Sequence, residues 1–180
     1  MKDRIKFNDV MLKAVINGRK TQTRRHADTQ TRRHADTQTR RPIKPQPKVT
    51  EDGLHYLSAW QDGYTLSEQV CAAWRHGFVD VDCPYGEIGD IINIANKDGN
   101  IKGKIEITDI WLQQVQEISQ QDAMKEGAPP NHASIDAVSR EYGFPDLPRS
   151  WFAQTWIDIY GKDNWVSNEW VWVVEFKKVE

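Results

Sequence analysis

Hydrophobic and polar residues alternate along two stretches of the chain, and this period of two predicts β-strands. Residues 102–111 alternate isoleucine with charged side chains, and residues 170–179 place tryptophan, valine and phenylalanine on two separate faces. Residues 91–94 form a compact apolar run after turn signals, and residues 4–7 have the composition of a short strand. Because Asp98-Gly99 is a hairpin signal, two of the four predicted strands should be joined by a tight turn.

Apolar residues spaced three and four positions apart predict helices between these strands. Four segments combine this spacing with capping or stop residues: 8–18, 119–127, 134–142 and 149–160. Residues 19–53 are predicted to be loop, and within the ambiguous stretch 54–82 residues 54–60 are compatible with a strand. Regular crossover helices are missing, so a doubly wound parallel sheet is disfavoured. The expected fold is α+β, a small, mostly antiparallel β-barrel with peripheral helices, in a single domain over residues 1–180.

An octapeptide, TQTRRHAD, repeats without a mismatch in residues 21–41, where two full copies are followed by a partial third. Alanine is its only apolar residue, so the unit cannot build a core, and it is much shorter than the units of solenoid proteins. We interpret residues 21–41 as a tandem duplication inside a surface loop of the domain, which costs little loop-closure entropy. The expansion either has no role of its own or strengthens the binding of a polyanion.

Positive charge is concentrated around this repeat. Residues 19–48 contain ten lysines and arginines against two acidic residues, whereas the whole chain has a formal net charge of −2. One basic segment on an acidic body is the asymmetry expected of a protein that binds phosphate or another polyanion. The candidate nucleic-acid-binding residues are Arg19, Arg24, Arg25, Arg40, Arg41 and Lys44.

Several other classes of protein and site are disfavoured by the sequence. The chain contains no apolar run of the length that spans a membrane and no pattern typical of a signal peptide, so we expect no membrane partner and a cytoplasmic location. Cys71, His76 and Cys83 do not have the spacing of a structural zinc site, and we expect no metal. Dinucleotide-binding and P-loop motifs are missing, and we expect no cofactor. The five tryptophans of the last 30 residues are interpreted as core packing.

The order of motifs resembles the ASCH domain family (activating signal cointegrator homology). The matching pieces are Gly18-Arg19-Lys20-Thr21-Gln22-Thr23-Arg24-Arg25, Gly89-Asp90-Ile91-Ile92, residues 118–127 around Glu126, and Trp172-Val173-Val174-Glu175-Phe176-Lys177. The resemblance implies a PUA-like β-barrel. CPYG at residues 83–86 and the C-terminal strand are similar to the subgroup found in phages and prophages.

This resemblance implies two activities. Some small bacterial members remove the acetyl group from N4-acetylcytidine with a lysine, a threonine and a glutamate, which match Lys20, Thr23 and Glu126. Other members bind RNA, and some cleave it. The repeat leaves Thr23, Thr31 and Thr39 as candidates for the threonine, and we favour Thr23 because it keeps the K-x-x-T spacing. Residues 95–99 lack the Arg-Glu-Thr that phage members often have there.

The chemistry of these residue types is coherent without the family. A threonine hydroxyl needs a neighbouring base to become a nucleophile, and nearby arginines would lower the pKa of Lys20 enough for that role. Glu126 would then protonate the leaving amine. Three hypotheses follow: an RNA- or nucleotide-binding module, an amidohydrolase acting on a modified nucleoside, and a small phage factor that binds a host protein.

Overall fold

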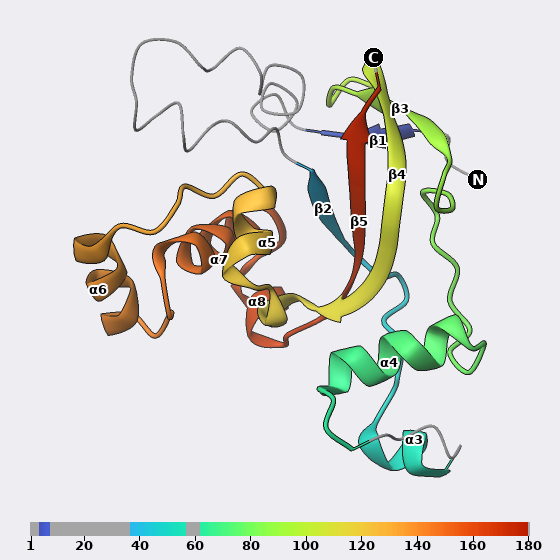
Figure 1. Cartoon of the computed structure of the whole chain (residues 1–180), viewed down its shortest axis with the longest axis horizontal. Coiled ribbons are helices and arrows are strands. Elements are labelled where there is room, and N and C mark those ends of the chain that lie inside the picture. Colours follow the sequence, from blue (N-terminus) through green and yellow to red (C-terminus); the bar gives the residue numbers. More distant parts are fainter. Residues whose placement is uncertain (1–3, 8–36, 57–61, 180) are drawn as a thin grey trace.

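Five strands form one mixed sheet in the order β1-β3-β4-β5-β2 (Figure 1). The computed structural model describes residues 4–7, 37–56 and 62–179. The strands are β1 (Arg4–Lys6), β2 (Gln38–Pro42), β3 (Ile91–Ala95), β4 (Ile101–Gln114) and β5 (Trp170–Lys178). β1 runs parallel to β3, and the other three pairings are antiparallel. The predicted α+β class is confirmed, as are the four predicted strands, which correspond to β1, β3, β4 and β5.

The two faces of β5 belong to two different hydrophobic clusters. Trp170, Trp172, Val174 and Phe176 pack in one cluster with Ile5, Phe7 and the isoleucines of β3 and β4. Val171 and Val173 pack in the other with residues of α7. This alternation was predicted from the sequence and is confirmed. β5 is the most heavily buried strand of the sheet. Burying each of its large apolar side chains stabilises the fold by roughly 1.5–3 kcal/mol.

Helices contribute to both of these clusters. They are α3 (Glu51–Tyr56), α4 (Leu66–Arg75), α5 (Gln120–Lys125), α6 (Ala133–Glu141), α7 (Leu147–Tyr160) and α8 (Lys162–Val166), with a 3-10 turn at Val115–Glu117. α4 contributes to the cluster that contains Trp172, and α7 to the cluster that contains Val173. Figure 1 accordingly shows α5, α6, α7 and α8 grouped together and α3 and α4 in a separate group.

The helix boundaries follow local capping. α5 begins after Ser119, whose hydroxyl accepts a hydrogen bond from the Asp122 N–H at 3.0 Å, as the capping pattern predicted. α7 begins two residues before the predicted start, because the Asp146 carboxylate accepts from the Arg149 N–H at 2.9 Å and caps the helix. The predicted helix over residues 8–18 lies outside the described residues. The possible strand over 54–60 is wrong for its first residues, which belong to α3.

The prediction of loop throughout residues 19–53 is wrong at two places. α3 begins at Glu51, and residues 38–42, from the third copy of the repeat and the following proline, form β2. β2 pairs antiparallel with β5, from Gln38 opposite Glu175 to Pro42 opposite Val171. The sequence QTRRP has no apolar alternation, so its strand character comes from pairing with a neighbour and not from its own pattern.

The sheet is open within the described residues, because no strand pairing joins β1 to β2. Its two edges nevertheless approach each other. Arg41 of β2 donates from Nη2 to the Lys6 carbonyl of β1 at 2.7 Å, and its guanidinium carbon lies 5.5 Å from the centre of the Phe7 ring. The sheet is therefore strongly curled. None of the helices in the described part of the chain is long and apolar enough to cross a membrane.

Removal of two repeat copies tests the interpretation of the insertion. Deleting residues 21–36 joins Lys20 to Thr37 and leaves β2 complete, so we expect an unchanged or slightly higher melting temperature in thermal unfolding. Deleting residues 21–41 also removes most of β2 and should lower the free energy of unfolding by several kcal/mol. A comparable loss in the shorter deletion would show that the extra copies pack against the domain.

Candidate functional site

A pocket of about 310 Å³ lies where the edge strand β2 meets the end of α5 and one face of α7. We call it the β2 pocket. Its volume lies at the lower end of the range for small-ligand sites. It is lined by Lys6, Thr39, Arg40, Arg41, Glu126, Trp151, Phe152, Thr155, Trp156, Ile159 and Tyr160. It therefore unites a hydroxyl, a carboxyl, two guanidinium groups and an aromatic wall.

Thr39, in the third repeat copy, is the candidate threonine that the structure, within its described residues, places in the β2 pocket. It is 1 % exposed, and its hydroxyl oxygen accepts a hydrogen bond from Arg41 Nε at 3.1 Å. Arg41 in turn is fixed by its bond to the Lys6 carbonyl. The hydroxyl proton of Thr39 is not used in the bond to Arg41, and a cation held beside the oxygen favours its deprotonated form.

Glu126 lies at the C-terminal end of α5, and the structure brings it into the same pocket as Thr39. It is 6 % exposed. Burial raises its pKa from 4.5 to about 7, although the positive charges of Arg40 and Arg41 act in the opposite direction. Its Oε1 atom is buried without a hydrogen-bond partner in the described part of the chain. A carboxyl that exchanges a proton near neutral pH is suited to general acid–base chemistry and to pH-dependent binding.

Arg40 is placed differently from the sequence expectation. Its side chain is completely buried and lies between Asp122 and Glu126, with Nη2 3.5 Å from Asp122 Oδ2 and Nη1 3.6 Å from Glu126 Oε1. The expectation of an exposed basic loop is therefore wrong for Arg40. Its guanidinium is removed from water, and the carboxylates of Asp122 and Glu126 compensate for the lost hydration. Lys44 is exposed outside the β2 pocket, and Arg41 is half-buried in its wall.

The other candidate residues lie outside the described residues: Arg19, Lys20, Thr23, Arg24, Arg25 and Thr31. Their segment, residues 8–36, connects β1 to β2, and both of these strands contribute to the β2 pocket. Of the sequence-predicted catalytic residues, Glu126 is therefore in the pocket, and Lys20 and Thr23 stay predictions. Thr39, the alternative threonine, is the one brought next to Arg41.

The aromatic wall of the pocket was assigned only to packing by the sequence analysis. The α7 positions that line the pocket are 151, 152, 155, 156, 159 and 160, which follow the i, i+1, i+4, i+5 pattern of one side of a helix, and this spacing was the available signal. Trp156 packs in the core, with its ring 4.3 Å from that of Tyr160, so the packing interpretation is confirmed for it. Trp156 also lines the pocket, and its indole Nε1 is buried without a hydrogen-bond partner among the described residues.

Comparison of the chain with known protein families, with curated proteins and with solved structures finds no match. The assignment of a site therefore depends on the geometry of the molecule.

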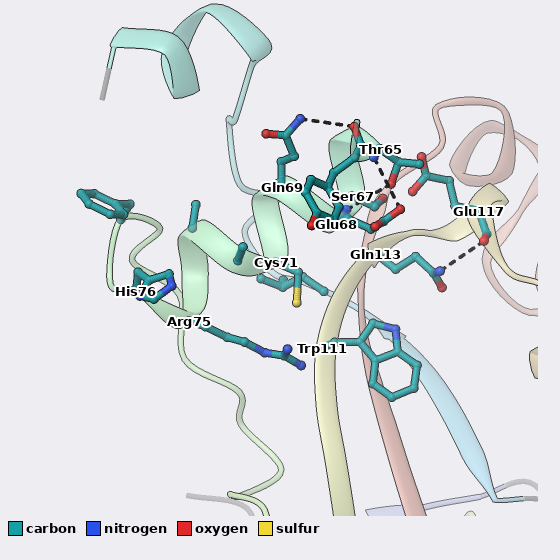
Figure 2. A pocket seen from close by; sticks show the side chains of 15 residues that line it. Thr65, Ser67, Glu68, Gln69, Cys71, Arg75, His76, Trp111, Gln113 and Glu117 are labelled. Atoms are coloured by element: carbon teal, nitrogen blue, oxygen red, sulfur yellow. Dashed lines mark hydrogen bonds between the residues drawn. The ribbon is translucent and has the colours of Figure 1, made fainter. Parts of the chain in front are cut away.

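A second, larger hollow of about 960 Å³ lies between α4 and β4, and we call it the α4 groove (Figure 2). Several of its polar side chains are bonded within the chain: Thr65 and Glu68 cap α4, and Gln113 Nε2 donates to the Glu117 carbonyl at 3.1 Å. Arg75, which also lines it, donates to a β4 carbonyl at 3.3 Å. None of the described candidate residues lies there. The β2 pocket, in which Glu126 Oε1 and Trp156 Nε1 are buried without a hydrogen bond among the described residues, is therefore the better candidate.

The raised pKa of Glu126 predicts a specific dependence of stability on pH. The folded protein holds the carboxyl proton more tightly than the unfolded chain, so the group stabilises the fold below pH 4.5, and this contribution is lost as the pH rises to about 7. A shift of this size corresponds to about 3 kcal/mol at most. We expect Glu126→Gln to remove this decline in urea unfolding measured from pH 4.5 to pH 8. Glu117→Gln, at an exposed carboxylate, is the control and should retain it. An unaltered decline in Glu126→Gln would contradict the assignment.

Proposed function

We propose that the protein binds RNA or a nucleotide in the β2 pocket. The observation that supports this most directly is the convergence of Arg41, Glu126 and a row of aromatic side chains from α7 in one small cavity. Arg41 offers a positive charge to a phosphate, and its bonds to Thr39 and to the Lys6 carbonyl hold that charge in place. The half-buried rings of Trp151 and Tyr160 offer surfaces on which a base can stack. Glu126 offers a carboxyl to the polar edge of the base.

The finer description of the fold belongs to the same proposal. We propose that the curled sheet is a PUA-like β-barrel of the ASCH type, from a phage or prophage lineage. The contact between Arg41 of β2 and the Lys6 carbonyl of β1 supports it, because these strands are the two ends of the open sheet. Strand irregularities in β3 and β4 are typical of sheets that bend toward closure.

Binding to a short single-stranded RNA, measured at several salt concentrations, tests the proposal. Affinity should fall steeply with salt, because phosphates that are neutralised by lysine and arginine release counterions. Deleting residues 21–36 removes four arginines and should flatten the slope, and Arg41→Met should lower the slope by about one unit. Arg75→Met is the matched control, since this arginine is 53 % exposed and lies at the α4 groove. Lack of binding at low salt, or binding that does not respond to salt, would exclude the polyanion function.

An amidohydrolase is the second candidate, and it is favoured by a carboxyl with a pKa of about 7 in the same pocket as an arginine-bonded threonine. In this reaction the Thr39 oxygen attacks the acyl carbon of an N4-acylated cytidine while a base takes the hydroxyl proton. The carbon–nitrogen bond then breaks as Glu126 protonates the amino group of cytidine, and water hydrolyses the acyl-threonine. The base of the K-x-x-T pattern would be Lys20. In the full chain, however, Asp36 occupies the position three residues before Thr39.

Turnover of N4-acetylcytidine in the 21–36 deletion variant tests this second function. The deletion places Lys20 three residues before Thr39 and should raise kcat by about 100-fold, the usual scale for a general base. In that variant, Lys20→Ala, Thr39→Ala or Glu126→Gln should each remove the gain, whereas Arg75→Met should not. If neither the full chain nor the deletion variant releases cytidine, the amidohydrolase function is wrong. In the full chain, loss of activity in Thr23→Ala but not in Thr39→Ala would restore the choice of Thr23.

A further inference from the structure

The Arg40 guanidinium is surrounded by partners from within the protein. Gln38 Oε1 accepts from its Nη1 at 2.9 Å, and Gln113 Oε1 accepts from Nε at 3.4 Å and from Nη2 at 3.1 Å. Two carboxylates, Asp122 and Glu126, lie within 3.6 Å, and the Phe152 ring centre lies 5.8 Å from the guanidinium carbon. These partners come from β2, from β4, from the first turn and the C-terminal end of α5, and from α7.

Burying this network carries a large desolvation free energy. Moving a charged group out of water costs several kcal/mol, which an interior ion pair repays only when its geometry satisfies the remaining donors. An apolar residue facing Phe152 would fill the same position of β2 without that cost. The chain instead keeps a buried cation whose partners include Glu126, the carboxyl that lines the β2 pocket.

The charges around Glu126 show what Arg40 does there. Arg40 and Arg41 face it from β2, Asp122 lies one turn earlier on α5, and the Tyr160 phenol faces it from α7. The Lys125 ammonium is directed to Glu175 at 2.9 Å and lies 3.9 Å from Asp122. Arg40 is thus the counter-charge that Asp122 and Glu126 share. Without it, the two carboxylates would repel each other and Glu126 would hold its proton to higher pH.

We propose that Arg40 is a positioning residue, which orients the Glu126 carboxyl at the wall of the β2 pocket and keeps it able to ionise, and that it does not contact the phosphates of a ligand. The inference rests on the proposed function for the statement that Glu126 meets the ligand. The relation between Arg40 and Glu126 itself is independent of any ligand.

The first experiment separates positioning from phosphate contact by measuring the binding of the short RNA against salt and against pH. In Arg40→Met we expect the salt slope of the wild type, together with a pH midpoint of binding moved upward by at least about one unit, which is a tenfold change in proton affinity. Arg41→Met should flatten the salt slope, and because Arg41 also faces Glu126 it should move the midpoint upward, but by less than Arg40→Met does. A flattened salt slope with an unmoved midpoint in Arg40→Met would overturn the proposal, because that is the behaviour of a phosphate ligand.

The second experiment is a double-mutant cycle with Glu126→Gln. If Arg40 acts through Glu126, adding Arg40→Met to Glu126→Gln should change RNA affinity less than about twofold, although Arg40→Met alone changes it about tenfold. Arg40→Lys keeps the charge without the fork and should retain the wild-type midpoint with an intermediate affinity. If Arg40→Met does not fold but the double variant does, the same coupling is shown. If the double variant also fails to fold, Arg40 is merely structural and the proposal is wrong.

A measurement without ligand keeps this inference distinct from the proposed function. Carbon-13 NMR titration of the Glu126 carboxyl should give a higher pKa in Arg40→Met than in the wild type and an unchanged one in the control Arg75→Met. An upward shift in a protein that binds no RNA would refute the binding function and leave the positioning role standing. An unshifted titration in a protein that does bind RNA would refute the role of Arg40 alone.

Discussion

The pairing of β5 with strands on both of its edges is the constraint on which the rest of the structure depends. β4 pairs with it along nearly its whole length, β2 pairs with its other edge, and its apolar side chains enter both hydrophobic clusters. A strand buried on both faces and bonded on both edges has a single admissible register, because a slip of one residue would exchange its two faces. The position of β2, and with it the β2 pocket, follows from this register.

β2 is a polar strand at the edge of the sheet. Gln38 and Arg40 are both buried, so the neighbouring helix must supply polar partners. α5 supplies them through Asp122, which is bonded to Gln38 at 3.1 Å, and through Glu126. The polar contacts between β2 and α5 are therefore required if TQTRR is to be part of the sheet. Its consequence is a carboxyl with a raised pKa beside a hydroxyl and two guanidinium groups, which is a combination found at functional sites more often than in ordinary cores.

The repeat shows how an insertion can be tolerated next to such a site. Its three TQTRR copies are identical in sequence. Only the third copy is followed directly by Pro42 and Ile43. Ile43 is buried, and its N–H donates to the Trp170 carbonyl at 3.1 Å, so the chain after β2 is anchored at the start of β5. This anchor explains why the third copy pairs with β5 as β2 and brings Thr39 to the pocket.

The sequence by itself determined the elements whose signals are local. Alternation identified β4 and β5 and assigned the two faces of β5. Capping residues identified α5, and apolar spacing with the stop at Gly161 identified α7. β2 escaped prediction because its polar sequence becomes a strand only through a partner that lies more than 130 residues later in the chain. The aromatic face of α7 was visible as a pattern, but its second role as a pocket wall was not. Tertiary structure alone decided that Thr39, Arg40 and Glu126 meet, and that Arg40 is buried, because burial and pKa depend on neighbours brought together by the sheet and not on adjacent residues.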